Sequence, residues 1–237
     1  MTATSNAADA FFGTVTLSDL GLIRASGSDA ASFLHGQLTQ DIETLAEGEA
    51  RLAGYCSAKG RLLASFIVWR SGPEEILLAC SADVLPATLK RLSMFVLRTK
   101  CKLTDASAEL QLWGLAGPPA TQWLGSAAPS SPWRTASAGA GHAVRLSDVN
   151  GLGRYLWCAP RGLPAPELPV LAEQAWAWLE VHSGIARITS GTTERFVPQM
   201  VNFELVAGVN FRKGCYPGQE IVARSQYRGT IKRRSFL

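Results

Sequence analysis

Alternating apolar and polar positions predict most of the strands in this chain. The segment GLIRASGSDAASFLHGQLTQDI, residues 21–42, begins with such a strand and continues through a turn into a helix. Residues 50–70 predict a β-hairpin whose turn is SAKG, where Gly60 supplies a positive φ. Residues 74–80 and 108–115 each predict one further strand, and residues 142–160 predict a second hairpin.

Other segments repeat their apolar residues at a helical period. The helix within residues 21–42 is expected to have Ser28 as its cap. A second helix is expected in residues 81–99, with Ser81 or Asp83 as cap and Pro86 in its first turns, and a third in residues 168–188. The apolar stripe of the first helix is Ala31, Leu34, Leu38 and Ile42, and that of the third is Leu171, Ala175, Trp178 and Leu179.

The middle of the chain, residues 116–141, is rich in Pro, Gly, Ser and Ala. It predicts a short helix followed by a surface loop. Hairpins thus alternate with helices that follow strands, and no repeat of fixed period is present. This order indicates an α+β fold with mostly antiparallel sheets.

Composition narrows the class of protein. The chain has 237 residues and is 47% apolar, which suits one large domain or two small ones with a real core. Its longest apolar run, residues 62–69, is far shorter than the ~20 residues that span a bilayer. The first residues lack the basic and apolar regions of a signal peptide. We therefore expect a soluble, cytoplasmic protein without membrane partners.

The charge is only mildly basic, with a net value of +4 and 18% charged residues. This balance is compatible with an anionic ligand but does not indicate nucleic acid by itself. The basic residues near the end of the chain are best explained as a solvated face, and a nucleic-acid interface is the alternative that we rank last because aromatic residues are not interleaved with them. These basic residues are Arg224, Arg228, Lys232, Arg233 and Arg234.

Five cysteines are present, an odd number with no C-x-x-C pair, which argues against a disulfide framework and a zinc ribbon. Four of them are expected in the core: Cys56, Cys80, Cys101 and Cys158. The three histidines, His35, His142 and His182, show no ligand spacing, so no metal site is predicted. A metal site or a Cys–His dyad whose partners meet only in the fold is an alternative that we rank low.

Cys215 differs from the other cysteines because it lies in RKGCYPGQEIVARSQYRG, residues 212–229. Lys213 precedes it, and a helix is expected to begin near Gln219; both features favour the thiolate form of a cysteine. Gly214 and Gly218 remove side-chain bulk, so that a ligand or partner can approach the backbone. The alternative is that Cys215 is only a small residue in a tight turn.

The segment KGCYPGQEIVAR closely resembles the K-G-C-[FY]-x-G-Q-E signature of the YgfZ-type folate-binding proteins, relatives of the glycine-cleavage T-protein (aminomethyltransferase). The resemblance covers nearly the whole chain, including GSDAASFLHGQLTQDI, YCSAKGRLLASF and VNGLGRYLW. The matching motif residues are Lys213, Gly214, Cys215, Tyr216, Gly218, Gln219 and Glu220. The resemblance implies Cys215 and Lys213 as the chemically active pair.

The resemblance also implies a fold. We expect a T-protein-like α+β structure with ferredoxin-like antiparallel sheets and helices. The expected division is a discontinuous first folate-binding domain, residues 1–50 plus 105–230, and an inserted α+β domain, residues 51–104. Family members usually continue into a C-terminal β-barrel domain, so residues 231–237 are expected to be the start of a truncated domain, with the barrel absent.

The cofactor that the resemblance implies is tetrahydrofolate, in a cleft near Gln199, Asn202 and the hairpin around Gly153. Such a ligand needs polar groups for its pterin edge, an aromatic slot and a cation for its glutamate tail. The candidates are Gln199 and Asn202 for the edge, Phe203, Tyr155 and Trp157 for the slot, and Arg154 or Arg24 for the tail.

The function that the resemblance implies is an accessory factor for the assembly or repair of iron–sulfur enzymes. Its partners would be those enzymes or their assembly factors. The alternative is a folate-dependent aminomethyltransferase, and whether the chain has classical enzymatic turnover stays open. The cysteine favours the first function, since T-protein chemistry relies on a carboxylate near the folate.

Overall fold

The computed structural model describes residues 7–229 and 233–236. They form two compact units, one from Met1–Ser18 with Ala108–Ser183 (unit 1) and one from Asp19–Ser107 with Gly184–Leu237 (unit 2). The compact units place residues 19–50 with 51–107, whereas the division expected from the sequence placed residues 1–50 with 105–230. That expected division concerns folate-binding domains and stays a prediction.

Unit 1 contains a five-stranded antiparallel sheet in the order β1-β7-β10-β9-β8. Its strands are β1 (Gly13–Thr16), β7 (Leu110–Ala116), β8 (Thr135–Ala138), β9 (Gly141–Arg145) and β10 (Arg154–Pro160). Its helices are η1 (Ala7–Phe11), α3 (Pro118–Leu124), η2 (Gly125–Ala127) and α4 (Glu173–His182).

Aromatic side chains build the core of unit 1. Trp113 on β7 pairs with Trp157 on β10, and their ring centroids lie 4.9 Å apart. On α4, Trp176 packs over Gly114, where an added β-carbon would lie 2.8 Å from the indole ring. The buried tryptophan of α4 is therefore Trp176, and the predicted apolar face was wrong for Trp178, which is 39% exposed.

Unit 2 contains a second five-stranded antiparallel sheet, in the order β3-β4-β5-β2-β6. Its strands are β2 (Leu20–Ser26), β3 (Ala50–Cys56), β4 (Leu62–Gly72), β5 (Glu75–Ser81) and β6 (Lys102–Asp105). Its helices are α1 (Ala30–Gln37), α2 (Leu85–Ser93), η3 (Pro198–Val201) and α5 (Gln219–Tyr227).

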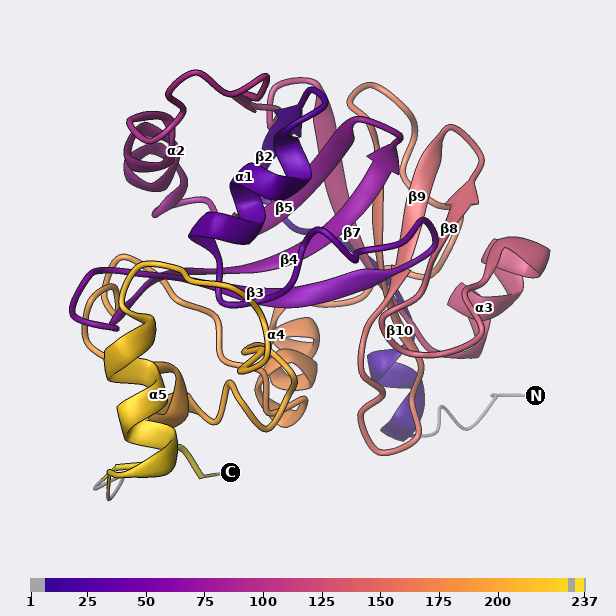
Figure 1. Ribbon diagram of the computed structural model, residues 1–237. Helices are drawn as coiled ribbons and strands as arrows, with labels where there is room; N and C mark the ends of the chain where they lie inside the picture. The colour runs from indigo at the N-terminus through magenta and orange to yellow at the C-terminus, as the bar shows by residue number, and fades with distance from the viewer. Residues whose placement is uncertain (1–6, 230–232, 237) are drawn as a thin grey trace, which may run out of the picture. The chain divides into compact units, whose positions relative to one another are not determined.

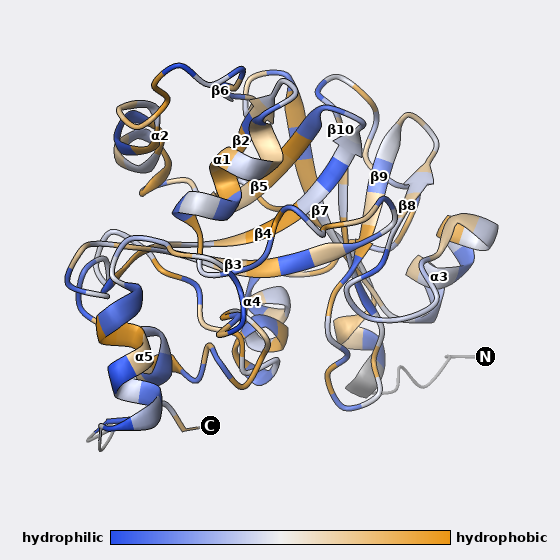
Figure 2. Ribbon diagram, viewed as in Figure 1, coloured by the Kyte–Doolittle hydropathy of each residue, from blue (hydrophilic) through white to orange (hydrophobic). Residues whose placement is uncertain are grey.

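The core of unit 2 lies between this sheet and α1 (Figure 1). Phe33 and Leu34 of α1 are buried in one cluster with Phe66 of β4 and Leu78 of β5. Figure 2 shows hydrophobic residues along β4 and β5, and the burial pattern of β5 agrees with this colouring. A strand buried on both faces needs apolar residues at consecutive positions, as ILLAC provides.

The predicted α+β class is confirmed, and every pairing between named strands is antiparallel. The hairpin turn at residues 57–60 is also confirmed, with Gly60 at φ 67°. The sequence missed β1, β6 and β8, which have four residues each. Such short strands carry too few alternations to be distinguished from a loop.

The predicted helix caps were wrong. Asp29 occupies the cap of α1 and Val84 that of α2, and neither uses its side chain as a cap. Asp83 instead accepts hydrogen bonds from the main chain and hydroxyl of Ser190. Helix α1 ends at Gln37, so Leu38 and Ile42 are buried but lie beyond the helix.

Residues 231–237 were expected to be the start of a truncated domain. Residues 230–232 and 237 lie outside the described residues, and residues 233–236 have no regular secondary structure. Within the described part of the chain, no helix has both the length and the apolar character needed to cross a bilayer.

Candidate functional site: the segment around Cys215

The motif segment leads directly into α5, as the sequence predicts. Gly218 is the cap residue at φ 80°, and α5 begins at Gln219. Cys215 is exposed, three residues before this cap, whereas the other four cysteines are buried. Most of α5 is coloured hydrophilic in Figure 2, and its buried residue is Val222. The thiol of Cys215 is thus accessible at a helix start that has a positive dipole end.

Position 218 requires a glycine because the backbone of the β3–β4 turn lies directly next to it. A β-carbon added at Gly218 would lie 2.3 Å from the main-chain oxygen of Ser57 and 2.7 Å from the Cα of Gly60. Its left-handed φ also disfavours any other residue. The expectation that Gly218 makes room for a ligand is therefore corrected: the β3–β4 turn occupies that space.

Gly214 differs from Gly218, because its φ is not positive and an added β-carbon would have ordinary contact distances. The nearest side-chain atom to that β-carbon would be Nε2 of His35, at 3.5 Å. The space predicted next to the motif backbone is therefore present at Gly214, and the side chain beside it is the imidazole of His35.

Lys213 is buried, and its ammonium group forms hydrogen bonds at the C-terminal end of α1. Its Nζ donates to the main-chain oxygens of His35 and Leu38, the latter at 2.8 Å. It also lies 4.8 Å from the ring centroid of Tyr216. Burial lowers the pKa of Lys213 to about 8, while nearby negative charges, that of Cys215 among them, act in the opposite direction. Lys213 therefore fixes the position of the motif in addition to supplying a cation near the thiol.

The remaining motif residues support the same loop. Tyr216 is buried, and burial raises the pKa of its phenol. Gln219 donates from Nε2 to the main-chain oxygen of Gly214 at 3.5 Å. Glu220 is exposed in the first turn of α5, where a carboxylate complements the helix dipole.

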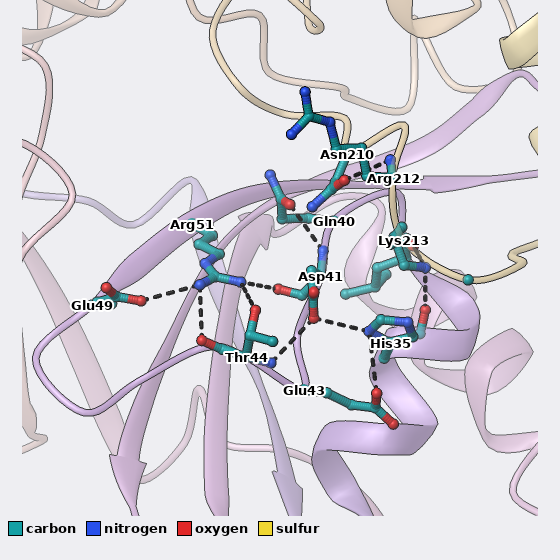
Figure 3. A network of polar contacts seen from close by, with 12 residues as sticks. His35, Gln40, Asp41, Glu43, Thr44, Glu49, Arg51, Asn210, Arg212 and Lys213 are labelled. Atoms are coloured by element: carbon teal, nitrogen blue, oxygen red, sulfur yellow. Dashed lines mark hydrogen bonds and ion pairs between the residues drawn. The ribbon is translucent and has the colours of Figure 1, made fainter.

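A polar network next to the motif joins α1, the loop that follows it and β3 (Figure 3). Nδ1 of His35 lies 3.1 Å from Oδ1 of Asp41, and Arg51 donates to the main-chain oxygen of Asp41. Burial raises the pKa of Asp41, but hydrogen bonds from Thr44 and His35 outweigh this effect, and the net pKa is below its ordinary value. The sequence did not connect His35 or Asp41 with Cys215, since they lie far away along the chain.

Four residues predicted to bind folate lie in unit 2, and three of them have defined protein partners. Gln199 is fully buried and donates to the main-chain oxygen of Val222 at 2.9 Å. Asn202 donates to the main-chain oxygen of Ser235 and accepts from Arg234, at 2.8 Å in each case. Phe203 is fully buried. Arg24 forms an ion pair with Glu75, at 3.2 Å.

The other three predicted residues lie in unit 1. Arg154 is buried, donates from Nε to the main-chain oxygen of Ser147 and lies over the ring of Trp176. Burial lowers the pKa of Arg154, against the raising effect of nearby carboxylates. Trp157 is buried in the core cluster. Tyr155 is buried but lines a cavity, and its hydroxyl lies 3.0 Å from that of Thr121.

This cavity has a volume of about 1030 Å³ and lies within unit 1. Its walls include Tyr155, Trp178 and the hairpin tip Val149–Gly153, where Asn150 and Gly151 both have positive φ. The cleft that the sequence predicted near Gly153 thus has a counterpart, whereas Gln199 and Asn202 do not line it.

Comparisons with known proteins agree on one family. Residues 4–152 match the GCVT N-terminal domain family. A tRNA-modifying protein YgfZ from Colwellia psychrerythraea is 31% identical over 230 residues, covering 94% of this chain and 70% of that protein. A protein of the same name from Edwardsiella ictaluri is 33% identical over 234 residues, covering 90% of this chain and 67% of that protein.

Among solved structures, the glycine cleavage system aminomethyltransferase T from Bartonella henselae superposes with a TM-score of 0.72 at 17% identity. The match covers 91% of this chain and 63% of the aminomethyltransferase, so the chain spans less than two thirds of that protein. This likeness shows that the fold is T-protein-like. Together with the sequence matches, it shows that the chain belongs to the YgfZ family and carries a GCVT N-terminal domain.

Proposed function

We propose that this chain is a tetrahydrofolate-binding accessory protein that supports the assembly or repair of iron–sulfur enzymes, with Cys215 as its working thiol. The observation that carries the proposal is the position of Cys215 in a YgfZ-family chain. It is the exposed one of five cysteines, and it lies in KGCYPGQE at the start of α5. Nucleophilic and redox cysteines need this combination of access and a positive local field.

The cavity of unit 1 supports the folate part of the proposal. Its aromatic walls, which include Phe11, Tyr155 and Trp178, match a flat ring system, and Gln122 and Asn150 offer amides for a polar edge. Arg145 is a cation in the same wall, although its Nη2 already donates to both carboxylate oxygens of Asp148. These residues fit a reduced folate, which would supply a one-carbon unit or act as its acceptor.

Gln199, Asn202, Phe203, Arg154 and Arg24 stay proposed as folate contacts with less support. Gln199, Phe203 and Arg154 are buried. A ligand could reach them only if the contacts around them opened. Tyr155 has more support as a folate contact, because it lines the cavity of unit 1.

The proposed partners are iron–sulfur enzymes or their assembly factors, in the cytoplasm. The YgfZ relatives are named tRNA-modifying proteins, so we propose that the enzymes supported here include ones that modify tRNA. Direct binding of nucleic acid is not part of the proposal.

Aminomethyl transfer is the second candidate function, because the fold is that of an aminomethyltransferase. It requires a carboxylate near the folate and gives the cysteine no role. Aminomethyltransferase activity that persists in Cys215→Ala would favour this function over the first.

Complementation of a strain lacking its own YgfZ protein tests the first proposal. The wild-type chain should restore iron–sulfur enzyme activity and tRNA modification, whereas Cys215→Ala should not. Cys158→Ala, which removes a buried thiol, is the matched control at equal protein level. Full complementation by Cys215→Ala would refute the role of the thiol. Calorimetric titration of this chain and of a full-length relative with tetrahydrofolate tests the cofactor.

A further inference from the structure

His35 presents its two ring nitrogens to two different groups. Nδ1 lies 3.1 Å from Oδ1 of Asp41 and 3.9 Å from Oε2 of Glu43. Nε2 faces the motif, since a β-carbon built on Gly214 would lie 3.5 Å from it. Consecutive Cα atoms are about 3.8 Å apart, so Cys215 follows directly after the residue that Nε2 faces. An imidazole and the segment that carries the thiol, from distant parts of the sequence, thus lie next to each other.

Lys213 holds these two segments together. Its Nζ donates to the main-chain oxygen of His35 itself, and the next residue along the chain is Gly214. The hydrogen bond of Lys213 therefore brings the backbone of Gly214 next to the imidazole of the same histidine. Because residue 214 has no side chain, nothing at that position stands between the imidazole and the segment that carries the thiol.

Asp41 sets the proton position on the imidazole. Its pKa is below the ordinary value, so the carboxylate is ionised at neutral pH and accepts a hydrogen bond from Nδ1–H. The lone pair of the neutral ring is then on Nε2, the nitrogen that faces the motif. Glu43 adds negative charge on the Nδ1 side, and the Lys213 ammonium lies on the motif side.

We propose that His35 is the base for Cys215 and that Asp41 is its positioning residue. The proton leaves Sγ of Cys215 and binds Nε2 of His35, the thiolate stays on Cys215, and Asp41 stabilises the imidazolium that forms. This is the arrangement of nucleophile, base and orienting carboxylate that activates cysteines in unrelated proteins. The proposal rests on the proposed function only in taking Cys215 as the working thiol.

The test is the rate of alkylation of Cys215 by iodoacetamide, mapped by mass spectrometry from pH 6 to pH 10.5. It compares the wild-type protein with His35→Gln and Asp41→Asn. His182→Gln, a histidine of unit 1, is the control. His35→Gln should react at least about tenfold more slowly at pH 7, because the base is lost. At pH 10.5 the alkylation rates should converge, because hydroxide then deprotonates the thiol without help from a histidine. The alkylation rate of Asp41→Asn at pH 7 should lie between the rates of the wild type and of His35→Gln.

Equal rates of wild type and His35→Gln at pH 7 would overturn the proposal. An equal loss of alkylation rate at pH 7 and pH 10.5 in His35→Gln would also overturn it, because such a loss would mean reduced access to the thiol. Circular dichroism and the melting temperature of each variant show whether it is folded. Complementation by Cys215→Ala is a separate measurement, so the proposed function can fail while the His35 effect persists, and the reverse.

Discussion

Nζ of Lys213 lies 2.8 Å from the main-chain oxygen of Leu38, a residue 175 positions earlier in the chain. Leu38 is the cap residue at the end of α1, where carbonyl groups lack intrahelical donors. A lysine at this place satisfies such carbonyls and complements the negative end of the helix dipole. The motif is therefore anchored on α1 by the residue that the sequence associated only with the thiol.

Replacing Lys213 by Met should change how stability depends on pH. The folded-state pKa of Lys213 is about 8, below its ordinary value of 10.5, so the unfolded chain binds more protons between these values. The contribution of Lys213 to the free energy of unfolding thus rises with pH over this window, by about 3 kcal/mol at most. The wild type should gain stability relative to Lys213→Met from pH 7.5 to pH 10.5 in urea unfolding. Lys90→Met, at an exposed position, should show no such gain, and parallel profiles for wild type and Lys213→Met would contradict the assignment.

Alanine at Gly218 should destabilise the protein much more than alanine at Gly214. The Gly218 variant would place a β-carbon 2.3 Å from the main-chain oxygen of Ser57 at a left-handed φ. We expect a loss of about 2–5 kcal/mol in the free energy of unfolding. The Gly214 variant meets ordinary contact distances and should lose less than about 1 kcal/mol. Similar losses in the two variants would show that the β3–β4 turn can move away.

Cys215 should be alkylated faster than the other cysteines under native conditions. Burial raises the pKa of Cys56 and of Cys80 to about 12, and both thiols are shielded from reagents, whereas Cys215 is exposed. We expect a rate ratio of at least about 100 at neutral pH. Mass-mapped labelling measures it, and labelling in urea provides the unfolded reference. Comparable rates for Cys215 and Cys56 would contradict the prediction.

Trp178→Ala should weaken tetrahydrofolate binding if the cavity of unit 1 is the folate site. Trp178 lines this cavity, and stacking on an aromatic ring is worth about 0.5–1.5 kcal/mol. The dissociation constant from calorimetry should therefore rise about 2–12-fold. Val181→Ala is the control, because Val181 lies on the same helix, is exposed and does not line the cavity. An unchanged constant in Trp178→Ala would place the ligand elsewhere.

The sequence by itself determined the strands and helices that carry long, regular patterns. The turn at Gly60, the central strands β4 and β5 and the start of α5 follow from local patterns of apolar residues, glycine and proline, and the structure has them where they were predicted. The motif also determined the family, because a long run of specific residues identifies relatives without any structure. The four buried cysteines were also predicted correctly, Cys80 and Cys158 for the same local reason, since each ends an apolar run that indicates a core.

Only the tertiary structure decided which residues lie next to the segment that carries Cys215. His35 and Asp41 reach the motif because the chain returns to α1 after more than 170 residues, and no local pattern encodes that meeting. The structure also decided that Gly218 accommodates the β3–β4 turn and that Trp176, rather than Trp178, is buried. Local patterns record the period and polarity of a segment, whereas such contacts depend on how distant segments pack against one another.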